Sequence, residues 1–412
     1  MITHHQPALA RNIPLYYLFN FLRDFQIWIP VWVVFLTLEQ GFSLTEVTAA
    51  DACFLIGIVV LEVPTGAVAD RWGRSRSVGL GALLLAVAIG IFALTTSFTI
   101  LLASFLTWSL AHSLMSGADM ALLYDSLKGL GREAEYERRA GLGGALAWAG
   151  AALGTLFGGP VAALLGTEAT IWAGVLTTLL AAGVAFAMVE PAQDHHEARP
   201  GVLENVRIAA KAITRDAGIR WMVLLSAGVM AAMGSAMYLV QPYLLASGVE
   251  VGIVFSLLQV PQLLGGMAGS LLAYRAARML GERRAIVVCG AIGVGAYAGA
   301  AAVTTLGGFV FIPIFALFEA LTLPVSSGYI NRRVESAQRA TVLSMHSFAA
   351  SLMRAPLAVA TGMAADAHSP RWAFGMLGVV LLAVVVAGVL AWGRGGRRGS
   401  GEPALTIAET AG

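Results

Sequence analysis

The sequence predicts an all-α integral membrane protein with twelve transmembrane helices arranged as two six-helix pseudo-repeats. Three observations predict this class: an apolar composition, twelve long apolar runs, and basic residues that collect on one side of those runs. We expect the two six-helix bundles at residues 1–189 and 220–393. A charged central loop at 190–219 separates them, and a disordered cytoplasmic tail is expected at 394–412 because that segment is rich in Gly, Ala and Thr.

The composition is that of a chain surrounded by lipid. Of its 412 residues, 58% are hydrophobic and only 12% are charged, and the mean hydropathy is +0.77. A soluble domain carries about a quarter charged residues, and one core of this size would not hide so much apolar surface. The 47 glycines agree with membrane helices, because small residues allow such helices to pack closely.

Twelve runs of roughly twenty or more mostly apolar residues are long enough to cross a bilayer. They lie at 13–38, 46–69, 76–96, 98–123, 140–165, 169–189, 220–246, 249–274, 285–304, 307–330, 340–365 and 371–393. Several connections are very short, such as Thr96 to Phe98, and these predict antiparallel hairpins.

Lysine and arginine sort to one side of the twelve runs. Counted on alternate sides, 23 of the 26 basic residues fall on the side that also holds both termini, and only Arg371 falls on the other. The remaining two, Arg23 and Arg354, lie inside runs. Because positive charge marks the cytoplasmic side, we expect a multi-pass protein of the inner membrane with both termini in the cytoplasm.

Other features exclude several kinds of protein. The net charge of +2 implies no nucleic-acid partner. No lysine follows a glycine, so the chain lacks the phosphate loop of an ATP-driven motor. Nothing resembles a metal site, and the two cysteines, Cys53 and Cys289, sit in apolar runs. We therefore expect no enzyme activity, cofactor or metal, and a monomer whose partners are a small-molecule substrate, protons and the lipid bilayer.

The two halves show weak self-similarity. Arg139-Ala140 opens the fifth run, and Arg339-Ala340 opens the eleventh. Pro30 and Pro242 lie near the outer ends of the first and seventh runs. Duplicated halves in the same orientation favour a substrate site between them.

A motif between the second and third runs identifies a family. The segment 66–76 reads GAVADRWGRSR, which resembles the loop motif G-x-x-x-D-R/K-x-G-R-R/K-R/K of the major facilitator superfamily. The matching positions are Gly66, Asp70, Arg71, Gly73, Arg74 and Arg76. Ser75 departs from the motif at one basic position. With twelve runs and a central loop, the resemblance covers nearly the whole chain.

The resemblance implies that this loop latches the two halves together on the cytoplasmic side. Gly73 permits a tight turn, and Asp70 can pair with arginines or sit against a helix N-terminus. Glu62 extends the motif upstream, and Asp119 and Asp125 are expected near the cytoplasmic mouth, where they can pair with the loop arginines. The alternative is that the arginines only follow the positive-inside rule.

Ionisable groups inside the membrane are costly and therefore candidates for function. Counted at 1.5 Å per residue from the cytoplasmic ends, Arg23, Asp24, His112 and Glu319 lie about 15–17 Å deep. Arg354 lies about 21 Å deep on the same count, near the middle of a bilayer core of roughly 30 Å. Arg23 and Asp24 point about 100° apart on a helix and need not pair with each other.

The resemblance implies that the first, fourth, seventh and tenth runs line a central cavity, which holds Asp24, His112 and Glu319. Asp24 and Glu319 are the candidate proton-carrying carboxylates, and Arg354 is expected to neutralise one acid. The alternative is a set of structural ion pairs, and His112 is equally compatible with packing. Further polar groups are expected to line the cavity around helix breaks at Pro261 and Pro242; the residues concerned are Gln259, Gln262, Tyr238 and Gln241.

Drug:proton antiporters of the superfamily are the nearest functional resemblance. The fifth run contains Gly150, Gly154, Gly158 and Gly159-Pro160, which resembles the antiporter motif G-x-x-x-G-P with its spacing off by one. The buried arginine that such antiporters carry in the fourth run is absent here. We therefore expect a secondary transporter for proton-coupled efflux of amphipathic compounds or drugs. The alternatives are a proton-coupled importer or uniporter of a small metabolite and, less favoured, a non-transporting receptor or scaffold.

Overall fold

The computed structural model describes residues 6–191, 207, 211, 213–303, 305–334 and 336–396. Within these residues every regular element is helical, and twelve stretches are long and apolar enough to cross a membrane. The predicted all-α class and the twelve spans are confirmed.

The first six spans form the N half. Span one consists of α1 (Gln6–Asp24), η1 (Ile29–Val31), α2 (Trp32–Val34) and the π-helical η2 (Phe35–Glu39). Spans two to four are α3 (Leu44–Trp72), α4 (Arg74–Ala93) and the pair α5 (Phe98–Met115) and α6 (Ala118–Gly129). After the short η3 (Glu133–Glu135), spans five and six are α7 (Tyr136–Leu165) and α8 (Thr167–Phe186).

The last six spans form the C half. Span seven is built from α10 (Ala217–Gly234), the 3₁₀ segment η4 (Ser235–Leu239) and α11 (Val240–Ala246). Spans eight and nine are α12 (Ile253–Leu280) and α13 (Glu282–Ala302). Span ten joins η5 (Leu306–Phe311) to α14 (Ile312–Arg333), and spans eleven and twelve are α15 (Ser336–Ala367) and α16 (Pro370–Gly396).

Local chemistry explains where several helices begin. Ser97 caps α5, since its hydroxyl accepts from the Ile100 amide, and the Asp216 carboxylate caps α10 by accepting from Gly218 and Ile219. Gly73 separates α3 from α4 with φ at +99°, a value that residues with a side chain rarely adopt. The tight turn predicted at this glycine is confirmed.

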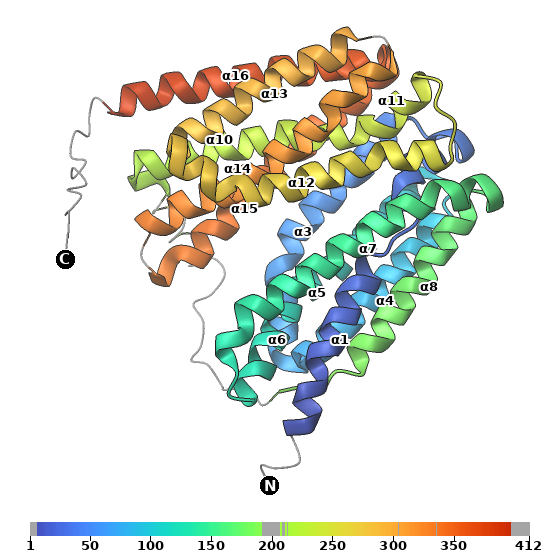
Figure 1. The fold of residues 1–412 in the computed structure, drawn as a ribbon, viewed down its shortest axis with the longest axis vertical. Helices are drawn as coiled ribbons and strands as arrows, with labels where there is room; N and C mark the ends of the chain where they lie inside the picture. The colour runs from blue at the N-terminus through green and yellow to red at the C-terminus, as the bar shows by residue number, and fades with distance from the viewer. Residues whose placement is uncertain are drawn as a thin grey trace.

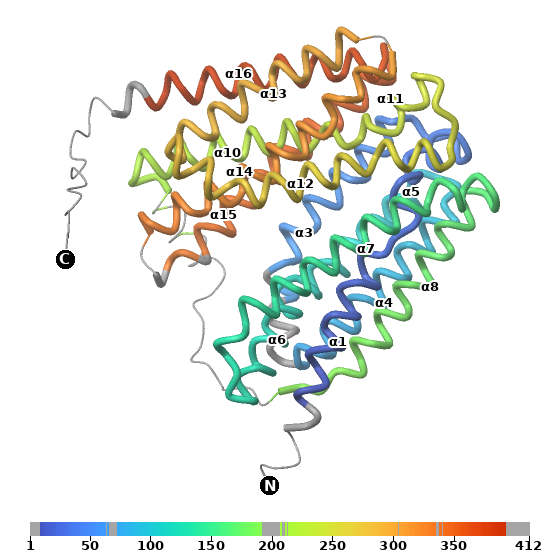
Figure 2. The backbone as a smooth tube through the Cα atoms, in the orientation of Figure 1, coloured from blue at the N-terminus to red at the C-terminus, as the bar shows by residue number. Residues whose placement is uncertain are grey.

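The two halves lie side by side at one end and diverge toward the other (Figure 1). We call the end with the loops around Arg74, Arg139, Arg283 and Arg333 the basic side, and the opposite end the far side. Both the start of α1 and the end of α16 lie at the diverging, basic side, and α3 of the N half lies next to α15 of the C half (Figure 2).

The halves are joined on the far side by side chains of the C half that bind the backbone of the N half. Gln241 accepts from the amides of Val33 and Val34 at 3.0 and 3.2 Å and donates to the Ile29 carbonyl at 2.9 Å. Gln259 donates to the Pro30 carbonyl at 3.1 Å. Span one is not a regular α-helix there, so the glutamines satisfy polar backbone groups that would otherwise lack partners in a membrane.

A second part of this far-side contact lies where α3 begins. The Asp366 carboxylate of α15 accepts from the amides of Leu44 and Thr45 at 3.0 and 2.8 Å, so a residue of one half caps a helix of the other. Ser256 of α12 accepts from the Gly159 amide at 2.8 Å. The contact thus extends along spans one, two and five of the N half.

The outer surface of the bundle fits a lipid environment. Large apolar side chains remain exposed along many spans, for example Leu164 at 82%, Leu271 at 74% and Val379 at 69% exposed. So much exposed apolar surface is unfavourable in water and ordinary in a bilayer.

Some expected boundaries need correction. Helix α12 continues through Pro261, so the break expected there is absent. Span seven leaves the α-helix at Ser235–Leu239, before Pro242, which lies in the first turn of α11 where proline is tolerated. Most of the central loop 190–219 and the tail from 397 onward lie outside the described residues.

Candidate functional site

Three spans depart from the α-helix beside charged side chains. Span one stops being helical after Asp24, span four is interrupted at Gly117 with φ at +74°, and span seven changes to a 3₁₀ helix after Gly234. Interrupted helices inside a membrane expose backbone groups and occur where a transporter lines a cavity. These interruptions therefore mark the candidate site.

The first group, which we call the N-half cluster, consists of Arg23, Asp24 and Asp119. The Arg23 guanidinium donates to Asp24 Oδ2 from Nη2 at 2.8 Å and from Nε at 3.0 Å. Its Nη1 donates to Asp119 Oδ2 at 3.2 Å. The sequence left open whether the neighbours Arg23 and Asp24 pair, and they do: α1 ends at Asp24, and the long arginine side chain folds back on the carboxylate.

Asp119 is not with the loop arginines, as the sequence suggested, but beside Arg23. Span four extends to Gly129, six residues beyond the expected end, so Asp119 lies about 15 Å from the basic end of the span. Gly117 starts α6 there, and Asp119 occupies its first turn, where the helix dipole favours an anion. The same extension places His112 roughly 9 Å further from the basic end than predicted.

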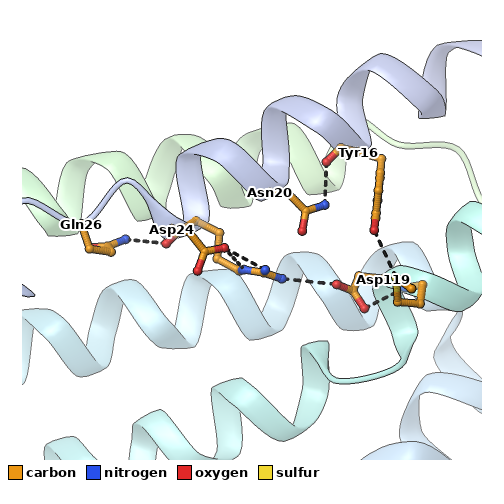
Figure 3. Close-up of polar contacts among 7 residues, drawn as sticks. Tyr16, Asn20, Asp24, Gln26 and Asp119 are labelled. Carbon is orange, nitrogen blue, oxygen red and sulfur yellow. Dashed lines mark hydrogen bonds and ion pairs between the residues drawn. The ribbon is translucent and has the colours of Figure 1, made fainter. Parts of the chain in front are cut away.

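Neighbouring polar side chains hold the N-half cluster in place (Figure 3). Gln26 donates to the Arg23 carbonyl at 2.8 Å and to Thr178 Oγ1 at 2.9 Å, and it accepts from the buried Trp28 indole at 2.7 Å. Asn20 donates to the Tyr16 carbonyl at 2.8 Å. His112 is exposed and contacts the Phe54 ring edge-on, with 6.1 Å between centroids.

The glycine face of α7 allows the interrupted part of span one to approach. A Cβ at Gly150 would lie 2.5 Å from the Phe21 carbonyl oxygen, and one at Gly158 would lie 2.2 Å from the Ile27 carbonyl oxygen. The glycines noted in the sequence therefore have a packing role against the segment that positions Arg23 and Asp24.

The second group, the C-half cluster, consists of Glu319 of α14 and Arg354 of α15. Arg354 Nη1 lies 3.6 Å from Glu319 Oε1, and Nη2 donates to the Gly234 carbonyl at 3.0 Å. A Cβ at Gly234 would lie only 2.5 Å from Glu319 Oε1, so this glycine leaves the space in which the pair forms. Arg354 thus neutralises Glu319 in this arrangement.

Asp51 is a site residue that the sequence analysis missed. Tyr238 of η4, which is fully buried, donates a short hydrogen bond to Asp51 Oδ2 of α3. The signal was present in the sequence, since Asp51 is the only charged residue between Glu46 and Glu62 in an apolar span. An acid in that position qualifies as a candidate by the same rule that selected Asp24.

Two of the three glutamines predicted to line the cavity lie instead in the contact between the two halves. Gln241 and Gln259 are buried, at 4% and 8% exposed, in the far-side contact between the halves. Gln262 is half-buried three residues further along α12. The first two therefore join the halves rather than face a cavity.

The loop motif makes its described contacts inside the N half. Arg74 forms a short ion pair with Asp125 and donates to the Ala121 carbonyl at 3.0 Å. The amides of Arg74 and Ser75 donate to the Glu190 carboxylate, each at 2.8 Å. The side chains of Arg76 and Glu62 are exposed, whereas those of Asp70 and Arg71, and the surroundings of Gly66, lie outside the described part.

Comparison with known proteins agrees with this architecture. Residues 16–318 match the family described as Major Facilitator Superfamily. A curated relative, "Uncharacterized MFS-type transporter YxaM" of Bacillus subtilis (strain 168), is 26% identical over 106 residues. That match spans 25% of this chain and only 26% of the relative's length.

Solved transporters share the fold. The nucleoside transporter NupG aligns with a TM-score of 0.76 at 13% identity, covering 93% of this chain and 99% of that one, and a variant of it reaches 0.80. A bacterial homolog to the human lysosomal transporter Spinster, in an inward-facing and occupied conformation, aligns with 0.72 at 17% identity, covering 93% and 96%. Identities this low show the fold alone. The family match covers well over half of the sequence, and the chain therefore belongs to the major facilitator superfamily of membrane transporters.

Proposed function

We propose that the protein exports small amphipathic compounds, cationic ones in particular, in exchange for protons. The observation that carries this proposal is that each half holds an arginine paired with a carboxylate that stays partly accessible. The side chains of Asp24 and Glu319 are 36% and 32% exposed. A carboxylate in such a place can take either a proton or a cationic substrate, and this competition couples the two flows.

The orientation follows from the basic loops. Because positive charge stays in the cytoplasm, the basic side is proposed as the cytoplasmic side of the inner membrane, with both termini there. The halves diverge toward that side and are joined at the far side (Figure 1). We therefore assign the arrangement to an inward-facing state, and propose that the protein acts as a monomer. In the opposite state the loop motif, with Gly66, Asp70 and Arg71, is proposed to latch the halves on the cytoplasmic side.

Aromatic side chains near the N-half cluster favour an amphipathic cation. Phe54 of α3 contacts both His112 and Trp108 of α5, with 5.4 Å between the Phe54 and Trp108 centroids. Aromatic faces attract a cation, and the same rings bind the apolar part of a substrate. The N-half cluster also carries two carboxylates against one guanidinium.

The alternative, import of an anionic metabolite, would use Arg23 and Arg354 as clamps. Both guanidinium groups are already engaged, Arg23 by two carboxylates and Arg354 by Glu319. An anion would have to displace these partners, so the pairing favours the cation exporter.

Transport by the purified protein in liposomes tests the proposal. We expect movement of a cationic dye when a pH gradient is imposed, and none when a protonophore collapses it. Asp24→Asn and Glu319→Gln are each expected to uncouple dye transport from the gradient. Glu168→Gln is the matched control, because Glu168 lies at the start of α8, away from both clusters, and accepts a hydrogen bond from Trp172.

Two results would contradict the proposal. Dye movement that continues unchanged without a pH gradient would exclude proton coupling. Gradient-driven transport that is indifferent to Asp24→Asn would remove this carboxylate from the coupling mechanism.

A further inference from the structure

A hydrogen bond within the spans, roughly 10 Å along α3 from its far-side start, connects side chains of the two halves. Tyr238 of span seven donates to Asp51 of span two, and the tyrosine is fully buried. The other bonds between the halves described above pair a side chain of the C half with N-half groups around the far end of the bundle. The Asp51–Tyr238 bond differs from them because its acid lies within span two rather than at the far end, and because its donor is a fully buried tyrosine that contacts the C-half cluster.

The tyrosine also contacts the C-half cluster. The Arg354 guanidinium carbon lies 5.7 Å from the centroid of the Tyr238 ring. Arg354 binds the Gly234 carbonyl, directly before the 3₁₀ segment that carries Tyr238, and the Met237 sulfur within that segment. Its Nε is buried and has no hydrogen-bond acceptor among the described residues. Asp51, Tyr238, Arg354 and Glu319 therefore form one continuous polar path from α3 to α14.

Few other charges compete for Asp51. Helix α15 contributes Arg354 and, at its far end, Asp366; its other two such groups bind elsewhere, Arg339 to the Val334 carbonyl and His346 to Ser226 of α10. Helix α5 contributes His112, which contacts Phe54. The remaining charged groups on elements packed against α3 lie at helix ends: Glu39 of η2, and Arg74 and Arg76 of α4. Arg354 is thus the one cation that reaches the surroundings of the Asp51–Tyr238 bond among the described side chains.

We propose that Asp51 is the carboxylate through which proton uptake loosens the contact between the two halves. The charged carboxylate accepts the tyrosine proton in a charge-assisted bond, which is about twice as strong as a neutral one. A proton from water in the opened site converts the carboxylate to a neutral acid, and the bond to Tyr238 weakens. Span seven is then released from span two, and Arg354 loses an electrostatic partner. This role rests on the proposed proton coupling and adds to Glu319 a second acid that senses the same proton.

Distances between spin labels on the far side test this role without substrate or gradient. Labels at Leu38 and Glu250, both exposed far-side positions on opposite halves, are placed in a background with Cys53→Ala and Cys289→Ala. In lipid nanodiscs across a pH series, we expect the separated population to grow as the pH falls. In Asp51→Asn the separated-to-joined ratio should rise about tenfold at high pH and no longer respond to pH.

Three further variants distinguish a titrating bond from an ordinary one. Asp51→Glu should keep a pH response, and Tyr238→Phe should favour separation at high pH because the donor is missing. Asp366→Asn weakens a different contact between the two halves, the one that α15 makes with the start of α3, so it should favour separation at every pH while keeping the response.

An unchanged pH response in Asp51→Asn would overturn the proposal, as would a wild-type protein whose halves do not respond to pH. These outcomes are independent of dye transport. Failure of transport in liposomes would contradict the exporter and leave the distance measurements to decide the role of Asp51.

Discussion

The N-half cluster and the C-half cluster each pair an arginine inside the membrane with acids, but they differ in the number of carboxylates that do so. Arg23 has two carboxylate partners, both in its own half, at 2.8 and 3.2 Å. Arg354 has a single described carboxylate within 4 Å, Glu319 at 3.6 Å, and shares its surroundings with a tyrosine bound to the other half. The N-half cluster therefore retains a partner when one carboxylate takes a proton, whereas the C-half cluster does not. We therefore expect protonation of the C-half cluster, rather than of the N-half cluster, to change the contact between the two halves.

The largest loss of stability is expected when Arg23 is removed from the N-half cluster. Arg23→Gln leaves Asp24 and Asp119 side by side without a cation. Loss of one partner from a fully buried ion pair costs about 3–5 kcal/mol, and the partial exposure of Arg23 and Asp24 lowers that cost here. We expect a large drop in the thermal unfolding temperature in detergent, only partly restored by Arg23→Lys. A melting temperature equal to that of the wild type would show that the cluster contributes little to stability.

Single carboxylate removals compare the clusters directly. Glu319→Gln leaves Arg354 without its described acid and should destabilise the protein by about 2–3 kcal/mol, the range for a largely buried charged group that loses its partner. Asp24→Asn should cost less, since Arg23 keeps Asp119. The double variant Asp24→Asn/Asp119→Asn should then lose more than the sum of the single losses. Equal effects of Glu319→Gln and Asp24→Asn on unfolding would remove the proposed difference.

Gly234 tests the geometry of the C-half cluster alone. Its Cβ would meet Glu319 Oε1 at 2.5 Å and Arg354 Nη1 at 2.8 Å, so Gly234→Ala should push the pair apart. We expect a loss of about 1–3 kcal/mol, the usual cost of overpacking, together with reduced transport. Gly295→Ala is the matched control, because a Cβ there meets nothing within 4 Å. Wild-type stability of Gly234→Ala would mean that the pair adjusts freely.

The smallest effect is expected away from both clusters. Asp366→Asn removes a charged cap from α3 but leaves an amide that can still accept from Leu44 and Thr45, so stability should fall by about 1 kcal/mol or less. The same change should make cysteines introduced at the far side label faster. A larger loss than for Glu319→Gln would show that this cap contributes more to stability than the C-half cluster does.

Much of the site was predictable because charge in a membrane is rare. Arg23, Asp24, Glu319 and Arg354 were selected by depth alone, and the structure brings them together as two pairs. Asp119 was misplaced because the sequence shows no sign of where span four ends, and six additional residues move it from the mouth of the bundle to Arg23. The roles of Gln241 and Gln259 depend on backbone groups freed in span one, which no local pattern reveals.

By itself the sequence determined the twelve spans, the family and the presence of buried charges. These properties follow from hydropathy and charge along the chain, which are local and additive. Only the tertiary structure decided which carboxylate meets which arginine, and that Asp51 meets Tyr238. Those pairings join residues that are 96 and 187 positions apart. They depend on how the interrupted helices pack against one another, which the sequence of a single segment does not determine.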